Sequence, residues 1–176
     1  MNSERQRIAM RSLVLAVLYL LALIATGIAS DTESNRASLK GIKGVRVSIE
    51  KLGHEVKEVG LTEDMILIDV ELQLRKAGIR VFTKEESDKI PGTPFLHVSI
   101  NTMENKVLNA HLTCINVKLY QEVYLVRDVS IKTTARTWSA EACGIVPNVV
   151  SKKDAREKIG DLVDIFINTY LAVNPR

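Results

Sequence analysis

The most extended apolar pattern in the chain lies in its second half. Residues 111–126 (HLTCINVKLYQEVYLV) and 129–145 (VSIKTTARTWSAEACGI) are rich in Thr, Val, Ile and aromatic side chains, which favour β-strands. Arg127 and Asp128 separate the two segments and predict a tight turn. We therefore expect a long β-hairpin beside which the other elements lie.

The first half of the chain predicts a β-α-β unit. Residues 45–50 alternate apolar and polar side chains, which is typical of a half-buried strand. Thr62 is a plausible helix N-cap, and apolar residues recur at helical spacing up to Gly78, a typical residue for a helix C-terminus. Residues 79–82 (IRVF) follow at once and predict a short strand.

A further strand and a closing helix complete the pattern. Residues 95–103 place alternate apolar side chains on one face of a strand. Ser151 predicts the start of a helix whose apolar residues, from Ala155 to Tyr170, recur over five turns.

The element order is therefore β-α-β-β-β-β-α, and every element has one apolar face. We expect an α+β fold: a two-layer sandwich in which two helices cover one face of a mixed sheet of about five strands. This single domain should span residues 41–176, after a flexible, polar lead-in at residues 30–40.

The N-terminal segment has the pattern of a secretory signal peptide over residues 1–29. Three Arg precede an apolar run over residues 13–25, and small residues follow, which predicts cleavage near Ala29 and Ser30. The alternative is an uncleaved membrane anchor over residues 13–29, whose 17 residues are at the lower limit for a bilayer span. In either case the rest of the chain is expected to be exported, to the periplasm or beyond.

The charge of the domain gives it no electrostatic attraction to nucleic acid or to anionic lipid. Residues 1–29 hold three of the 24 basic and one of the 21 acidic side chains, so 21 basic and 20 acidic side chains remain. A net charge of +1 gives no electrostatic attraction to nucleic acid, and contact with a membrane is expected only if the N-terminal segment is retained.

Motifs for catalysis or cofactor binding are absent from the sequence. The three His residues (His54, His97 and His111) do not belong to a metal-ligand motif, and no nucleophile motif or phosphate-binding Gly-rich loop occurs. We therefore expect no catalytic residue, no metal and no cofactor, and a protein that is not an enzyme.

Cys114 and Cys143 could form a disulfide, because an exported protein permits one. The apolar residues of both hairpin strands are mainly odd-numbered, and side chains opposite each other share a face. Odd residues should then pair with odd residues, which places the two cysteines on opposite faces of the sheet. This register disfavours a disulfide between them.

The same register turns several aromatic and basic side chains away from the helices. Such side chains can form a docking surface, because their amphipathic rings suit protein interfaces. The alternative is that they only stabilise an exposed sheet face through cross-strand pairs. The candidate docking residues are Tyr120, Tyr124, Trp138, Lys118 and Arg136, with Lys132 among them.

The element order resembles the small α/β domain of bacterial envelope proteins, namely the TolB amino-terminal domain and LptE-like lipoproteins. The resemblance rests on residues 45–49, on LQLRKAGIRVF (residues 72–82), on the hairpin and on LVDIFINTYLAVNP (residues 162–175). The chain departs from these families because it has no lipobox Cys and no second domain.

This resemblance implies a role in the bacterial cell envelope. We expect an exported, non-enzymatic binding or adaptor module with an envelope protein as its partner. The alternative is a ligand carrier or an enzyme accessory subunit whose site is completed by a partner.

Overall fold

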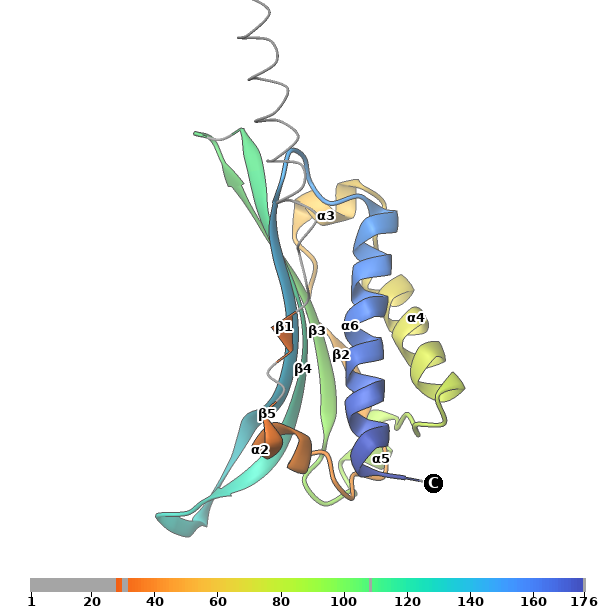
Figure 1. The fold of residues 1–176 in the computed structure, drawn as a ribbon, viewed down its shortest axis with the longest axis vertical. Coiled ribbons are helices and arrows are strands. Elements are labelled where there is room, and N and C mark those ends of the chain that lie inside the picture. Colours follow the sequence, from red (N-terminus) through yellow and green to blue (C-terminus); the bar gives the residue numbers. More distant parts are fainter. Residues whose placement is uncertain (1–27, 30–31, 108, 176) are drawn as a thin grey trace, which may run out of the picture.

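The computed structural model describes residues 28–29, 32–107 and 109–175, which form an α+β fold (Figure 1). Its two long helices lie on the same side of a curved sheet. The strands are β1 (Ile28–Ala29), β2 (Arg46–Ile49), β3 (Phe95–Asn105), β4 (Ala110–Leu125) and β5 (Asp128–Val146). The helices are α2 (Glu33–Ala37), α3 (His54–Glu58), α4 (Glu63–Lys76), α5 (Lys84–Ser87) and α6 (Lys152–Val173).

The sheet is mixed, as the sequence predicts. Its strand order is β1-β5-β4-β3-β2, where β2 runs parallel to β3 and the other neighbours are antiparallel. Four of these strands have four or more residues, and β1 adds two residues at the edge beside β5. The signal-peptide prediction falls outside the described residues, except for the backbone of Ile28 and Ala29.

The predicted strand at residues 79–82 is wrong. Val81 forms one isolated parallel bridge to Val45, and Thr83 then caps helix α5. The segment between Gly78 and that cap is too short to add a full strand, so four substantial strands are present rather than about five. Residues 54–58 and 84–87, which lack a helical apolar stripe, form the short helices α3 and α5.

Helix α4 begins where the sequence predicts. The Thr62 hydroxyl accepts a hydrogen bond from the Met65 N–H at 3.3 Å, as an N-cap does. Glu63 accepts hydrogen bonds from Lys57 at 2.7 Å and from the Leu52 N–H at 3.0 Å. These contacts, with the Lys57 hydrogen bond the largest cause, lower the pKa of Glu63 to about 2. The first turn of α4 is thereby fixed to the loop that follows β2.

The core lies between the sheet and the two long helices. Helix α6 buries one stripe along its length, and Arg156 of α6 holds Asp69 of α4 through two hydrogen bonds of 2.7 and 2.9 Å. The buried residues of α6 are Ala155, Ile159, Leu162, Val163, Phe166, Ile167 and Tyr170. They face the apolar side of β3, β4 and β5, so the apolar residues of these strands share one core with the helices.

The register of the β4–β5 hairpin shifts at two places, between Tyr124 and Leu125 beside the turn and between Tyr120 and Leu119 farther into the sheet. Near its turn, from Tyr120 opposite Arg136 to Tyr124 opposite Lys132, even residues face even residues, as the sequence predicts. Thr137 is then an extra residue in β5, and beyond it Leu119 lies opposite Trp138. This β-bulge inverts the parity of the pairing for the rest of the hairpin.

Candidate functional site

The face of the sheet that points away from the helices is built from β3, β4 and β5, and we call it the open face. Its side chains form cross-strand rows over β3, β4 and β5. From the β4–β5 turn toward the β3–β4 turn, the rows are Phe95–Tyr120–Arg136, His97–Lys118–Ser139, Ser99–Asn116–Glu141, Asn101–Cys114–Cys143 and Met103–Leu112–Ile145.

The aromatic residues of the first two rows contact one another. Phe95 and Tyr120 stack with ring centroids 5.2 Å apart, and the Arg46 guanidinium lies 4.9 Å from the Phe95 centroid. The rings of His97 and Tyr120 meet edge to face, with their centroids 6.0 Å apart. The Nε2 atom of His97 lies 3.7 Å from a carboxylate oxygen of Glu50. Tyr120 is therefore half-buried and held by neighbours within the sheet.

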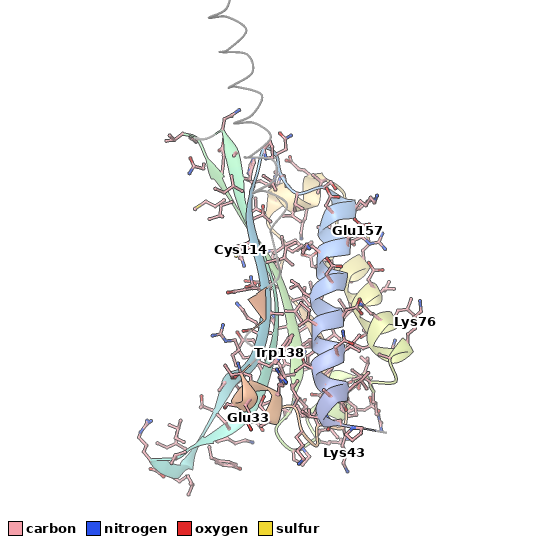
Figure 2. All side chains as sticks on the ribbon, in the orientation of Figure 1. Glu33, Lys43, Lys76, Cys114, Trp138 and Glu157 are labelled. Carbon is pink, nitrogen blue, oxygen red and sulfur yellow. A yellow bond between two sulfur atoms is a disulfide. The ribbon has the colours of Figure 1, made fainter. Side chains whose placement is uncertain are left out.

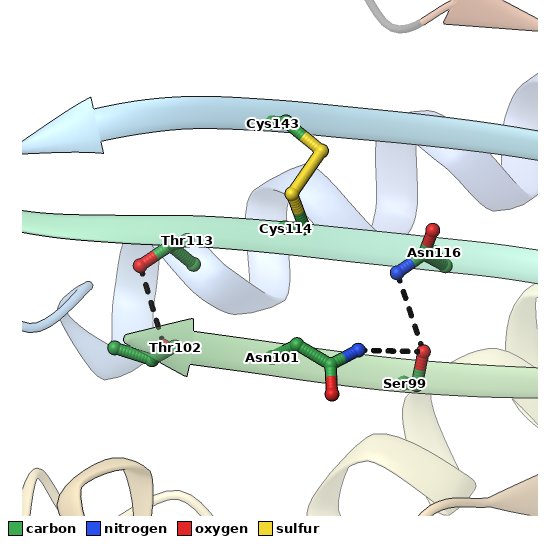
Figure 3. The surroundings of a disulfide bond; sticks show 7 residues. All are labelled: Ser99, Asn101, Thr102, Thr113, Cys114, Asn116 and Cys143. Carbon is green, nitrogen blue, oxygen red and sulfur yellow. Dashed lines mark hydrogen bonds between the residues drawn. A yellow bond between two sulfur atoms is a disulfide. The ribbon is translucent and has the colours of Figure 1, made fainter. Parts of the chain in front are cut away.

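The rows that contain Ser99 and Asn101 carry polar side chains, some of which are buried. Asn116 and Asn101 both donate side-chain hydrogen bonds to the Ser99 hydroxyl, at 3.3 and 3.5 Å (Figure 3). Ser99 and Asn116 are buried, so these hydrogen bonds satisfy polar groups that have little access to water.

The cysteine prediction is corrected by the structure, because Cys114 and Cys143 form a disulfide on the open face (Figure 3). They lie directly opposite each other, with Cα atoms 4.1 Å apart. The parity argument fails because Thr137 inserts an extra residue between the turn and the cysteines. A register read from the turn alone does not detect that insertion.

The same bulge corrects the prediction for Trp138. This residue is 1% exposed and faces the helices, where its ring meets Phe166 edge-on at 5.2 Å between centroids (Figure 2). Its indole N–H has no hydrogen-bond partner among the described residues. Trp138 is therefore a core residue and cannot belong to the predicted docking surface.

Long-range contacts hold the bulge in place. Gln121 donates hydrogen bonds to the Thr137 hydroxyl at 2.7 Å and to the Ser38 carbonyl at 3.1 Å. The Ser38 hydroxyl in turn lies 3.2 Å from the Thr137 carbonyl, to which it donates. Ser38, which directly follows α2, therefore stabilises the extra residue Thr137 through contacts from outside the hairpin.

The other predicted docking residues divide into two groups. Lys118 and Tyr120 are half-buried within the sheet. Arg136 and Tyr124 are exposed, and Tyr124 lies beyond the last residue that β4 pairs with β3. The structure therefore does not bring the five predicted residues together on one surface.

Beyond Tyr120 the hairpin continues as a two-stranded ribbon, formed by residues 121–125 and 128–135, which no third strand joins (Figure 1). The ribbon projects from the body of the protein. Three exposed apolar side chains on the ribbon and its turn were not singled out by the sequence analysis: Val126 is 99% exposed, Val129 72% and Ile131 40%. The predicted docking residue Tyr124 lies beside them and is 63% exposed. Lys132 and Glu122 form an ion pair of 2.6 Å across it, which raises the pKa of Lys132.

A groove of about 420 Å³ lies between α4 and α6. Ile66, Val70 and Ile159 contribute apolar side chains to it, and the Arg156–Asp69 pair lies at its wall. The Arg156 guanidinium already has a carboxylate partner, so no unpaired charge of this pair points to a bound ion.

The histidines lie apart from one another, each beside one glutamate. The His54–Glu58, His97–Glu50 and His111–Glu55 pairs have nitrogen–oxygen distances of 3.5, 3.7 and 3.8 Å. Within residues 28–29, 32–107 and 109–175, no three His, Cys, Asp or Glu side chains are placed to hold a metal ion together. In the same ranges, none of the helices is both long and apolar enough to cross a membrane.

No protein-family model and no curated protein matches the chain. Two solved structures are similar, both of the PelC dodecamer from Paraburkholderia phytofirmans, one of them a single-substitution variant. Each is 13% identical and covers 82% of this chain; the TM-scores are 0.41 for the variant and 0.40 for the other structure. The matches cover 98% and 97% of those chains, respectively. At these values the likeness supports no conclusion about partners or assembly.

Proposed function

We propose that this protein is an exported, non-catalytic binding module of the bacterial cell envelope. The observation that carries this proposal is the Cys114–Cys143 disulfide. Disulfides persist in oxidising compartments outside the cytoplasm and are rare inside it. The N-terminal pattern of residues 1–29 supports export independently, because it comes from another part of the chain.

The β4–β5 ribbon is the element that we propose for partner binding. A two-stranded ribbon without a third strand is only marginally stable in water, and its outer edges can offer unpaired backbone groups. The Glu122 N–H on the β4 side already donates to the Gly92 carbonyl at 2.8 Å, whereas no strand pairs with the outer edge of residues 128–135. Exposed apolar residues at its tip, with Val126 almost fully exposed, add surface that a partner would bury. We infer that an extended segment of an envelope protein adds to this ribbon as a further strand.

Site-specific photo-crosslinking in the native host, followed by mass spectrometry, tests this proposal. A photoreactive residue at Ile131 should capture a defined protein, whereas the same residue at Ile68, which is 64% exposed on α4, should not. Both positions carry an exposed isoleucine, so the pair differs in location rather than in chemistry. Equal capture at both positions, or none at Ile131, would overturn the assignment of the ribbon.

Thiol counting on denatured, non-reduced protein from the host tests the export part separately. The disulfide predicts no free thiol, because Cys114 and Cys143 are the two cysteines of the chain. Two free thiols would remove the main support for an oxidising compartment and leave the ribbon result unaffected.

The groove between α4 and α6 favours a second candidate, a ligand carrier completed by a partner. Its volume of about 420 Å³ is in the range of small-molecule sites. Native mass spectrometry of protein from the host should then show a bound small molecule that a Gly160→Leu variant loses. A chain that carries no extra mass leaves the binding module as the proposed function.

A further inference from the structure

We propose that the β4–β5 ribbon binds an acidic partner strand. The bound segment is extended, alternates acidic with apolar side chains, and pairs with the outer edge of residues 131–136. This inference rests on the ribbon binding in the proposed function and adds the chemistry of the partner to it. Three features of the ribbon carry it: the open stretch of its edge, the alternation of its side chains and its charge.

The outer edge of β5 is open between two capped positions. At the turn end, the Ser130 N–H donates a hydrogen bond to the Asp128 carboxylate at 3.0 Å. At the other end, the Ser38 hydroxyl donates to the Thr137 carbonyl at 3.2 Å, and β1 pairs with β5 farther on. Among the described residues, no strand pairs with the outer edge of residues 131–136. This stretch of about 20 Å fits one strand of ordinary length.

The opposite edge of the ribbon, on β4, is less accessible. The hydrogen bond from the Glu122 N–H to the Gly92 carbonyl holds the loop that contains Gly92 against this edge. We therefore place the partner strand on the β5 side, where a longer stretch of backbone is free to pair.

The side chains of the open stretch divide between the two faces of the ribbon. Ile131, which is 40% exposed, shares one face with Thr133 and Ala135, and this row is uncharged. Lys132 and Arg136 lie on the other face, and both are exposed. Side chains of adjacent strands lie beside one another on the same face, so a partner strand would meet one uncharged row and one basic row. An alternation of apolar and acidic residues matches both rows.

The basic row keeps a net positive charge after its contacts within the protein. Glu122 of β4 pairs with Lys132 at 2.6 Å, whereas Arg136 forms no ion pair within the part of the chain that the structure describes. The loop beside the ribbon adds Asp88 and Lys89, whose charges cancel. An acidic strand would therefore meet one unpaired guanidinium and one ammonium group that has donors left for a second carboxylate. Opposite charges that face each other across two strands stabilise the pairing, and like charges oppose it.

The test uses the full chain in detergent and two fluorescently labelled peptides of about seven residues, a length that the open stretch can pair. In one peptide valine alternates with glutamate, and in the other valine alternates with lysine. Fluorescence anisotropy measures both affinities. We expect the glutamate peptide to bind at least about fivefold more tightly, because two opposite-charge cross-strand pairs take the place of two like-charge pairs.

Charge reversal on the ribbon locates the site. In a Lys132→Glu/Arg136→Glu variant the preference should invert, so that the lysine peptide binds more tightly. Arg136→Glu alone, which leaves the ion pair on the ribbon intact, should reduce the preference. The matched control is Lys152→Glu/Lys153→Glu, which makes the same change in net charge on exposed residues of α6 and should keep the preference for glutamate. The fluorescence of the buried Trp138 checks that each variant is folded.

Equal affinity for the two peptides, tighter binding of the lysine peptide, binding of neither, or inversion in the α6 control would overturn the proposal. Dimerisation of the full chain that the ribbon variants abolish would place a second copy on this edge instead, and would overturn it too.

Photo-crosslinking at Ile131 separates this inference from the proposed function. Capture of a host protein there, without a preference for the glutamate peptide, would refute the acidic partner and leave the ribbon as a binding site. Capture together with that preference is the expected result, and absence of capture would refute both.

Discussion

The two ends of the β4–β5 hairpin are built from the same two strands, but one end is packed against the helices and the other is exposed to solvent. On one side of Thr137, the hairpin belongs to a three-stranded region that is covered by α6 and closed by a disulfide. On the other side it is an uncovered ribbon with exposed Tyr and Val side chains. The bulge at Thr137 decides which β5 side chains face the core within the sheet. Beyond Tyr120, β4 has no β3 partner, which leaves the side chains of the ribbon exposed.

The largest expected effect comes from comparing Trp138 with Tyr124, which lie on the two sides of the bulge. Trp138→Ala should lower the free energy of unfolding by about 3–5 kcal/mol, because it empties a site against Phe166. Tyr124→Ala should change it by no more than about 0.5 kcal/mol, because that ring is exposed. Urea denaturation measures both values, and equal losses would refute the distinction between the two ends.

The variant Trp138→Phe separates the contribution of the buried ring from that of the indole N–H. Trp138→Phe removes the indole N–H that has no partner among the described residues, while it keeps an aromatic ring in the core. It should therefore cost less than Trp138→Ala in the same denaturation experiment. A larger loss would show that the N–H is satisfied in solution.

Removal of the disulfide should give the second largest effect. The cysteines are 29 residues apart, and closing a loop of that length is expected to stabilise the fold by about 3–4 kcal/mol, mainly through the unfolded chain. A Cys114→Ala/Cys143→Ala variant should lose this amount in urea denaturation. Reductant should destabilise the unsubstituted protein by a similar amount and leave the variant unchanged; sensitivity of the variant would contradict the assignment.

A smaller effect is expected from the contacts that hold the bulge. Gln121→Leu removes the hydrogen bonds to Thr137 and Ser38, which should cost about 1–2 kcal/mol and change the fluorescence of nearby Trp138. Gln73→Leu is the control, because it also loses two side-chain hydrogen bonds, to Gly160 and Asp164 between the helices. An unchanged Trp138 spectrum in Gln121→Leu would show that the bulge does not depend on this side chain.

The smallest effect concerns the ion pair on the ribbon. The Glu122 hydrogen bond raises the pKa of Lys132, so the pair's contribution is present below the ordinary lysine pKa of about 10.4 and is lost as pH rises through the raised value. Amide exchange of the ribbon, corrected for its intrinsic pH dependence, should therefore be constant between about pH 6 and pH 9. Loss of protection within that window would show that the ribbon depends on another group.

The sequence by itself determined the two long helices and the strands β2 to β5, but it missed the short elements β1, α2, α3 and α5 and predicted a strand at residues 79–82 that is absent. Thr62 and Ser151 cap the two long helices at the expected positions, because capping depends on residues within one turn. The apolar stripe of α6 and the alternation in β3 likewise follow from local periodicity. These features predicted an α+β fold with a mixed sheet, and they placed the long hairpin at residues 111–145, within one residue at each end of the observed 110–146.

Only the tertiary structure decided the register of that hairpin beyond Thr137. Alternation in a strand has a period of two residues, so one unpaired residue inverts every assignment after it, and the segment around Thr137 has no Gly to mark a bulge. Contacts from Ser38 and Gln121, distant from Thr137 in sequence, hold the insertion in place. For that physical reason the buried Trp138 and the Cys114–Cys143 bond followed from packing rather than from local pattern.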